Sequence, residues 1–153
     1  MSKKNVLGKL TLFFVGIMFC MSTAFSQEKL PVESIKSDWV LFKEAKGIKF
    51  YAKQEVIETN DGRKPVSYAV VKLENTTNKE VKLLYNLEVH YNLGCNNCNP
   101  NSEARQLVTI APNKSIEGKY TDGNTPLSVL LLNANLNNGW IPEYLMIGNL
   151  IIN

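Results

Sequence analysis

The chain of 153 residues has little of the chemistry that most catalytic sites need. It holds one histidine, His90, and no serine within a Gly-x-Ser-x-Gly pattern, which argues against a serine hydrolase. A glycine-rich phosphate loop, a His-Glu-x-x-His zinc motif and the spaced acidic run of a calcium loop are also missing. These absences predict a protein that is not an enzyme and that uses no cofactor.

An excess of charge of one sign is missing as well, once the first 26 residues are set aside. The full chain has 17 basic and 14 acidic residues, and three of its lysines lie within residues 1–26. The rest of the chain therefore carries 14 residues of each sign. A surface without net charge gives no electrostatic basis for capturing nucleic acid or an anionic membrane.

Residues 1–26 have the pattern of a secretory signal peptide. Lysines come first, residues 10–21 form an apolar run, and Ala24-Phe25-Ser26 supplies the small residues that a signal peptidase reads. The run is too short to span a membrane comfortably, which argues against a retained anchor. Cys20 raises the alternative of an acylated lipoprotein, but bulky Phe19 stands where lipoprotein signals carry a small residue. We expect cleavage after this segment, export to the periplasm or beyond the cell, and no membrane span in the mature chain.

Helical periodicity is also absent from the mature chain, and runs of alternating apolar and polar residues take its place. The clearest run begins at Val81 and keeps a two-residue period to Leu93, interrupted only by Leu84. A slip of one residue in this strand would expose its whole apolar side, so it fixes the register of its neighbours. Strands are predicted at residues 39–43, 47–56, 66–75, 81–93, 105–111, 115–120, 127–132 and 144–152.

These strands and the turn signals between them predict one all-β domain over residues 38–153. The pattern favours a two-sheet antiparallel sandwich of seven to eight strands, with a closed barrel as the main alternative. Residues 27–37 are predicted to be a flexible lead-in. Asn75-Thr76-Thr77 and Asn113-Lys114-Ser115 match the N-glycosylation acceptor pattern, which indicates exposed turns.

Motifs at strand edges and turns carry a resemblance to a known group of proteins. They are Trp39, Gly47-Ile48-Lys49-Phe50-Tyr51, Leu73-Glu74-Asn75-Thr76-Thr77 before Val81, and Ala111-Pro112-Asn113-Lys114-Ser115 with Glu117-Gly118. On these motifs the mature chain resembles the small secreted immunoglobulin-like β-sandwich proteins of Bacteroidota. The resemblance implies an immunoglobulin-like fold and no functional residue, because such proteins are largely uncharacterised. The two facing cysteines of antibody domains are missing, so Trp39 is expected to be an ordinary core or sheet-edge anchor.

Cys95-Asn96-Asn97-Cys98 is the one distinctive chemical motif. Its first interpretation is a structural disulfide, because an exported chain meets an oxidising compartment. The enclosed loop is so short that chain entropy gives a stabilisation of only about 2 kcal/mol. Asn96 and Asn97 suit a tight turn, since asparagine tolerates left-handed backbone geometry.

Two other interpretations of this motif stay open. A redox-active dithiol usually sits at a helix N-terminus, and no helical pattern follows Cys98. A metal site would use Cys95, Cys98 and His90, which lies within reach five residues earlier. Two thiolates suit copper(I), while a tetrahedral zinc site would need a further ligand. His90 can also be a surface histidine beside Glu88 and Asn92.

Two functions from different classes follow from this sequence. The first is a secreted, non-catalytic β-sandwich module that binds a protein or glycan or serves as an envelope accessory. It rests on a complete fold pattern beside an empty catalytic inventory. The alternative is a periplasmic thiol-redox or metal-binding protein that uses the corner formed by Cys95 and Cys98.

Overall fold

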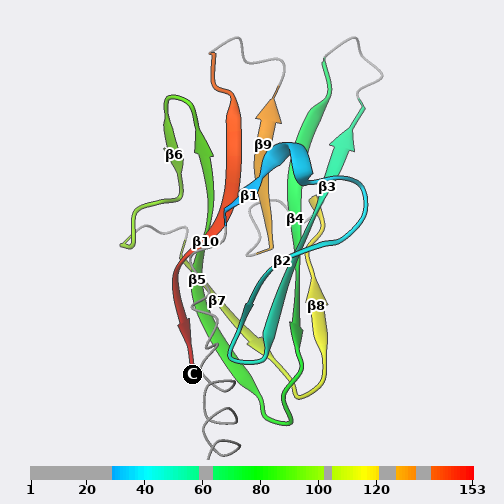
Figure 1. Cartoon of the computed structure of the whole chain (residues 1–153), viewed down its shortest axis with the longest axis vertical. Helices are drawn as coiled ribbons and strands as arrows, with labels where there is room; N and C mark the ends of the chain where they lie inside the picture. The colour runs from blue at the N-terminus through cyan, green and yellow to red at the C-terminus, as the bar shows by residue number, and fades with distance from the viewer. Residues whose placement is uncertain (1–28, 59–63, 102–104, 121–126, 134–138) are drawn as a thin grey trace, which may run out of the picture.

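The computed structural model describes residues 29–58, 64–101, 105–120, 127–133 and 139–153. The predicted signal peptide, residues 1–26, lies outside these ranges. Ten strands in the described ranges form two antiparallel sheets that pack against each other (Figure 1). Among the same residues, no helix has the length and apolar character needed to cross a membrane. The predicted all-β, two-sheet sandwich is therefore confirmed.

The strands follow the predicted ones closely. In chain order the elements are β1 (Leu30–Pro31), the 3₁₀ helix η1 (Val32–Ser34), β2 (Val40–Ala45), β3 (Ile48–Ile57), β4 (Val66–Asn75), β5 (Val81–Tyr91), β6 (Gly94–Asn96), β7 (Arg105–Ile110), β8 (Ser115–Glu117), β9 (Ser128–Asn133) and β10 (Pro142–Ile152). Seven described strands have six to eleven residues, and each coincides with a predicted strand, as does the shorter β8, whereas β1 and β6 were not predicted. The other three, β1, β6 and β8, have two or three residues each.

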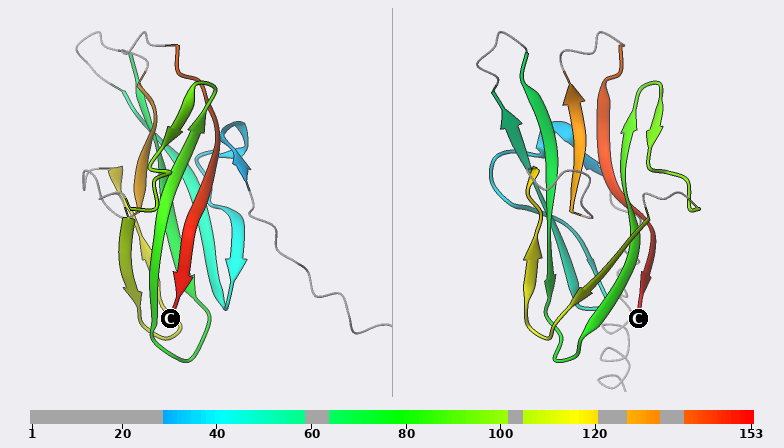
Figure 2. Two further views of the ribbon diagram at one scale, coloured as in Figure 1. Left: turned by 90° about the vertical axis from the view of Figure 1, so that its left-hand side faces the viewer. Right: turned by 180° about the vertical axis from the view of Figure 1, so that it is seen from behind.

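β5 and β4 are the central strands of the two sheets. In the first sheet, β10 pairs along one edge of β5, while β7 and β6 share the other edge. In the second sheet, β3 pairs along one edge of β4, and β8 and β9 share the other. β1 lies beside β10 and β2 lies beside β3. The left view of Figure 2 looks onto β6, β5 and β10 of the first sheet.

The alternation predicted for β5 is confirmed on its core side, where Leu83, Tyr85 and Val89 are fully buried. The opposite side of β5 faces away from the second sheet, yet Asn86 and Glu88 are 0% and 5% exposed there. A two-residue period does not predict this burial. It arises because the chain that follows β6 returns across the outer face of the first sheet, and its backbone is hydrogen-bonded to the Asn86 side chain.

The first described residues belong to the sandwich and not to a separate lead-in. Leu30 and Pro31 pair with β10, and Leu30 and Ile35 are buried in the core. The domain boundary predicted at residue 38 therefore lies too late in the chain. The local sequence gave no signal for this, because the strand that pairs with β1 lies at the other end of the chain.

Asn75, the last residue of β4, joins the two sheets. Its fully buried side chain donates through Nδ2 to the carbonyl oxygens of Lys79, Ala111 and Ile110, at 2.7, 3.1 and 3.2 Å. Its Oδ1 accepts from the backbone N–H and the hydroxyl of Thr77. The glycosylation patterns predicted exposed turns, and residues 113–115 and most of the turn after Asn75 are exposed. Asn75 itself is buried, because its amide is used inside the fold.

Trp39 lies just before β2 and is half-buried. The ammonium groups of Lys53 and Lys72 lie 4.8 and 5.0 Å from the centroid of its ring. Lysine charges at this distance from a tryptophan ring stabilise it by cation–π attraction. Trp39 therefore anchors the chain beside the second sheet, as expected of a sheet-edge residue.

Tyr85, on the core side of β5, makes the stability of the fold depend on pH in the alkaline range. Burial raises the pKa of its phenol well above 10, because the ionised form would lose its hydration. Below about pH 10 the phenol is protonated in both the folded and the unfolded state, so its contribution to stability is complete. Above this pH the unfolded state releases the proton first, and the free energy of unfolding falls by up to about 1.4 kcal/mol per pH unit.

Urea denaturation of the wild type and of Tyr85→Phe over this alkaline range measures the effect. We expect the variant to lose stability less steeply with pH, because phenylalanine has no proton to release. Equal slopes for the two proteins would contradict the assignment to Tyr85.

Candidate metal centre

Three neighbouring strands place three side chains in one row on the outer face of the first sheet. His90 of β5 is paired in register with Tyr144 of β10 on one side and with Cys95 of β6 on the other. Residues directly opposite each other in antiparallel strands project from the same face of the sheet. The register therefore brings Cys95 beside His90, as the sequence predicted was possible.

Cys95 and Cys98 are joined as a disulfide, with their Cα atoms 5.9 Å apart. That separation lies within the usual range for a disulfide. Asn97 between them has a φ of 66°, the left-handed geometry that the sequence predicted for an asparagine at this corner. In the described structure the chain from Gly94 to Asn101 forms a short strand and turns, so the helix that usually activates a redox dithiol does not follow Cys98.

Hydrogen bonds from side-chain amides fix this corner against β5. The Nδ2 atom of Asn86 donates to the carbonyl oxygens of Asn97 and Asn99, at 2.8 and 2.9 Å. The Nδ2 atom of Asn97 donates in return to the carbonyl oxygen of Leu87, at 3.2 Å. The corner is thereby held over β5 by contacts that do not depend on the disulfide.

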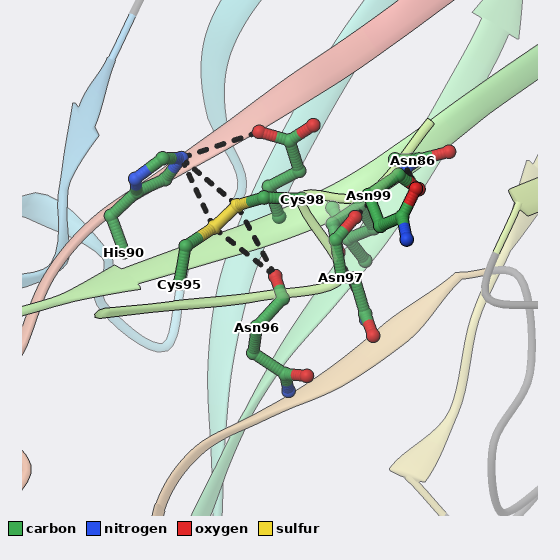
Figure 3. Close-up of polar contacts among 9 residues, drawn as sticks. Asn86, His90, Cys95, Asn96, Asn97, Cys98 and Asn99 are labelled. Atoms are coloured by element: carbon green, nitrogen blue, oxygen red, sulfur yellow. Dashed lines mark hydrogen bonds and ion pairs between the residues drawn. A yellow bond between two sulfur atoms is a disulfide. The ribbon is translucent and has the colours of Figure 1, made fainter. Parts of the chain in front are cut away.

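The imidazole of His90 points at both sulfurs of the corner (Figure 3). Its Nε2 atom lies 3.4 Å from the Sγ of Cys95 and 3.4 Å from the Sγ of Cys98. The same Nε2 lies 3.2 Å from Oε2 of Glu88. One potential ligand atom from each of these four residues lies within 4.8 Å of all the others.

Tyr144 and Lys29 form the far side of the site. The rings of His90 and Tyr144 are stacked, with centroids 4.4 Å apart and planes inclined by 14°. The ammonium of Lys29 lies 4.4 Å from the centroid of the Tyr144 ring. Stacking restricts rotation of the imidazole, so its Nε2 stays directed at the sulfurs and at Glu88.

Glu88 is the most enclosed member of the cluster. Its side chain is 7% exposed, compared with 24% for His90. Gly148 of β10 makes room for it, because a Cβ atom at that position would overlap the Glu88 carboxylate. A buried carboxylate is costly unless a hydrogen bond or a positive charge compensates it. His90 supplies the hydrogen-bonding partner here.

The sequence predicted three members of the cluster and missed the fourth. Cys95, Cys98 and His90 were grouped as a candidate site, whereas Glu88 was interpreted only as a neighbour of a surface histidine. The two-residue spacing of Glu88 and His90 on a strand places both on one face, and this signal could have identified it. The role of Gly148 depends on strand pairing, so no local pattern could have found it.

No protein-family model, no curated protein and no solved structure matches this chain. The candidate site combines two sulfurs, an imidazole nitrogen and a carboxylate oxygen. When the sulfurs are bonded to each other they form a covalent loop, and when they are reduced they become soft metal ligands.

Proposed function

We propose that this protein is an exported, non-catalytic β-sandwich that binds a thiophilic metal ion through Cys95, Cys98 and His90 when its disulfide is reduced. The observation that carries the proposal is the approach of one imidazole nitrogen to both sulfurs at 3.4 Å. The signal-peptide pattern of residues 1–26 supports export to the periplasm or beyond.

The distances around His90 suit a metal site. Zinc binds histidine nitrogen at about 2.0 Å and cysteine sulfur at about 2.3 Å. In a tetrahedron with those bonds, the nitrogen and each sulfur are about 3.5 Å apart. The observed 3.4 Å agrees with this value for both cysteines. The two sulfurs would stand about 3.8 Å apart around the same ion, so the disulfide must open before a metal can bind.

Opening the disulfide is a thiol exchange reaction with a dithiol partner. A thiolate of the partner attacks one sulfur of the Cys95–Cys98 bond and forms a mixed disulfide. The second thiol of the partner then releases the protein, so the partner becomes a disulfide and Cys95 and Cys98 gain two electrons and two protons. Binding of a divalent ion then displaces both thiol protons.

The test compares oxidised and reduced protein that has been exported and purified from an expression host. The protein is reduced with a phosphine, which does not itself bring thiols, and zinc(II) or copper(I) is offered in competition with a coloured chelator. We expect one ion per reduced chain and none per oxidised chain. Circular dichroism in both states controls for unfolding. A folded chain with two free thiols that leaves the chelator fully loaded overturns the proposal.

Partner binding, the other function predicted from the sequence, is the second candidate. Leu93, Trp140 and Ile141 are 62%, 39% and 63% exposed near the tip of the β5–β6 hairpin. The backbone N–H of Asn92 donates to the carbonyl oxygen of Ile141, and Gly94 lies close to the Trp140 ring. These contacts hold the three exposed side chains in one patch. Exposed tryptophan beside aliphatic residues is typical of protein interfaces. A pull-down from envelope extracts tests this role. Specific recovery of a partner protein, both by the wild type and by a variant that lacks Cys95 and Cys98, would favour it.

A further inference from the structure

We infer that Glu88 supplies the fourth ligand of the site, so that its carboxylate strengthens the binding of a divalent ion of the zinc type and not that of copper(I). This inference rests on the proposed metal site and adds to it the coordination number and the class of ion. It concerns a residue whose position is fixed by the long central strand β5 and by its pairing with β10.

The first support is the position of the carboxylate oxygen. Oε2 of Glu88 lies 3.2 Å from Nε2 of His90, and all four ligand atoms lie within 4.8 Å of one another. Around a tetrahedral zinc ion, a nitrogen and an oxygen bound at about 2.0 to 2.1 Å are about 3.3 Å apart. The separation of the Glu88 oxygen and the His90 nitrogen therefore suits two ligands of one tetrahedral ion.

The second support is the enclosure of Glu88. Its carboxylate occupies the space left by Gly148, and any larger residue there would displace it. Only 7% of the side chain reaches solvent, so the charge has little water to stabilise it. A bound cation in direct contact would stabilise this charge. His90 compensates it through a single hydrogen bond.

The ligand set decides the class of ion. Zinc(II) accepts sulfur, nitrogen and oxygen ligands together in one tetrahedron. Copper(I) favours soft thiolates, and a carboxylate contributes little to its binding. Calcium and magnesium require oxygen ligands throughout, which a site of two sulfurs and a nitrogen does not offer. Two thiolates and one carboxylate would leave a single negative charge around a divalent ion and two around a monovalent one.

The experiment titrates the reduced protein with cobalt(II), a coloured substitute for zinc(II), and repeats the zinc(II) and copper(I) competitions. The variants are Glu88→Gln, which keeps the size of the side chain, and Glu143→Gln, a matched change at an exposed glutamate of β10. We expect Glu88→Gln to weaken cobalt(II) and zinc(II) binding by about a hundredfold, the share of one ligand in a site of four, and to shift the visible cobalt bands. Copper(I) affinity should stay within about threefold, while Glu143→Gln should change nothing.

A second variant separates the ligand role from a merely structural one. Gly148→Ala forces the Glu88 carboxylate out of its position, so it should weaken zinc(II) binding in the same direction. Combined with Glu88→Gln it should add little further loss, because both changes remove one interaction. Equal weakening of zinc(II) and copper(I) in Glu88→Gln would indicate general damage and would overturn the inference.

The outcomes for the wild type and the variant distinguish the two proposals. A reduced wild type that binds no metal overturns the proposed function and this inference together. A reduced wild type that binds zinc(II), beside a Glu88→Gln variant with the same affinity and the same cobalt spectrum, overturns only the role of Glu88. Thiolate-to-cobalt absorption in the near ultraviolet should persist in Glu88→Gln, which confirms that both sulfurs still bind.

Discussion

Cys98→Ser is expected to weaken zinc(II) binding by the reduced protein by about a hundredfold to a thousandfold. Structural zinc sites with four protein ligands bind with about 10 to 16 kcal/mol, which is about 2.5 to 4 kcal/mol for each ligand. A serine hydroxyl stays protonated near neutral pH and cannot replace a thiolate. The effect should be equally large for Cys95→Ser, because His90 lies 3.4 Å from both sulfurs. Competition with a chromophoric chelator measures the affinity.

Asn96→Ser provides the matched control, since it changes an exposed residue between the two cysteines and keeps both thiols. We expect this variant to bind zinc(II) like the wild type. If Cys98→Ser and Asn96→Ser bind equally well, the sulfur of Cys98 is not a ligand. Mass measurement of each variant with and without reductant confirms which thiols are free.

Asn75→Ala is expected to lower the free energy of unfolding by about 3 kcal/mol or more. The substitution removes a buried amide and leaves the carbonyl oxygens of Lys79, Ile110 and Ala111 without this donor. Each buried polar group that loses its partner costs about 1 to 3 kcal/mol. Ile110 belongs to β7 of the first sheet and Asn75 to β4 of the second, so the contact between the sheets is weakened as well.

Urea denaturation of Asn75→Ala and of Asn78→Ala measures this loss. Asn78 lies in the same turn and is exposed, so its replacement should change stability by less than about 0.5 kcal/mol. Similar losses of stability for the two variants would mean that the hydrogen bonds of the Asn75 side chain stabilise the fold no more than an exposed residue of the turn does. Asn75→Asp offers a further comparison, because it places oxygen atoms where three carbonyl groups need a donor.

The alternation of β5 predicted correctly which side chains face the core up to Tyr91, but not for Leu93, which follows the end of β5 and is 62% exposed. Periodicity and burial repeat together every two residues in a strand that packs on one side. The same pattern could not reveal that Asn86 and Glu88 are covered on the other side. Their cover comes from the corner around Asn97, which is held by hydrogen bonds between residues of different elements.

In the candidate site, too, the sequence predicted the residues that are close together along the chain and missed those that strand pairing brings together. The grouping of Cys95, Cys98 and His90 followed from short spacing along the chain. The contributions of Gly148 and Tyr144 follow from the pairing of β10 with β5, which brings together residues far apart in sequence. The pairing of distant strands cannot be deduced from a single sequence, so the enclosure of Glu88 could not be predicted from it.

The division of one edge of β5 between β6 and β7 has a consequence for self-association. Strand β5 has described neighbours on both sides, and the carbonyl oxygen of Leu87, which lies between the residues paired with β6 and with β7, accepts a hydrogen bond from the Asn97 amide. Unpaired edges are the usual starting points for intermolecular β-stacking and fibril growth. Loss of the corner that carries Asn97 would leave this part of the β5 edge unpaired. Changes that disrupt the corner should therefore promote aggregation before they cause global unfolding.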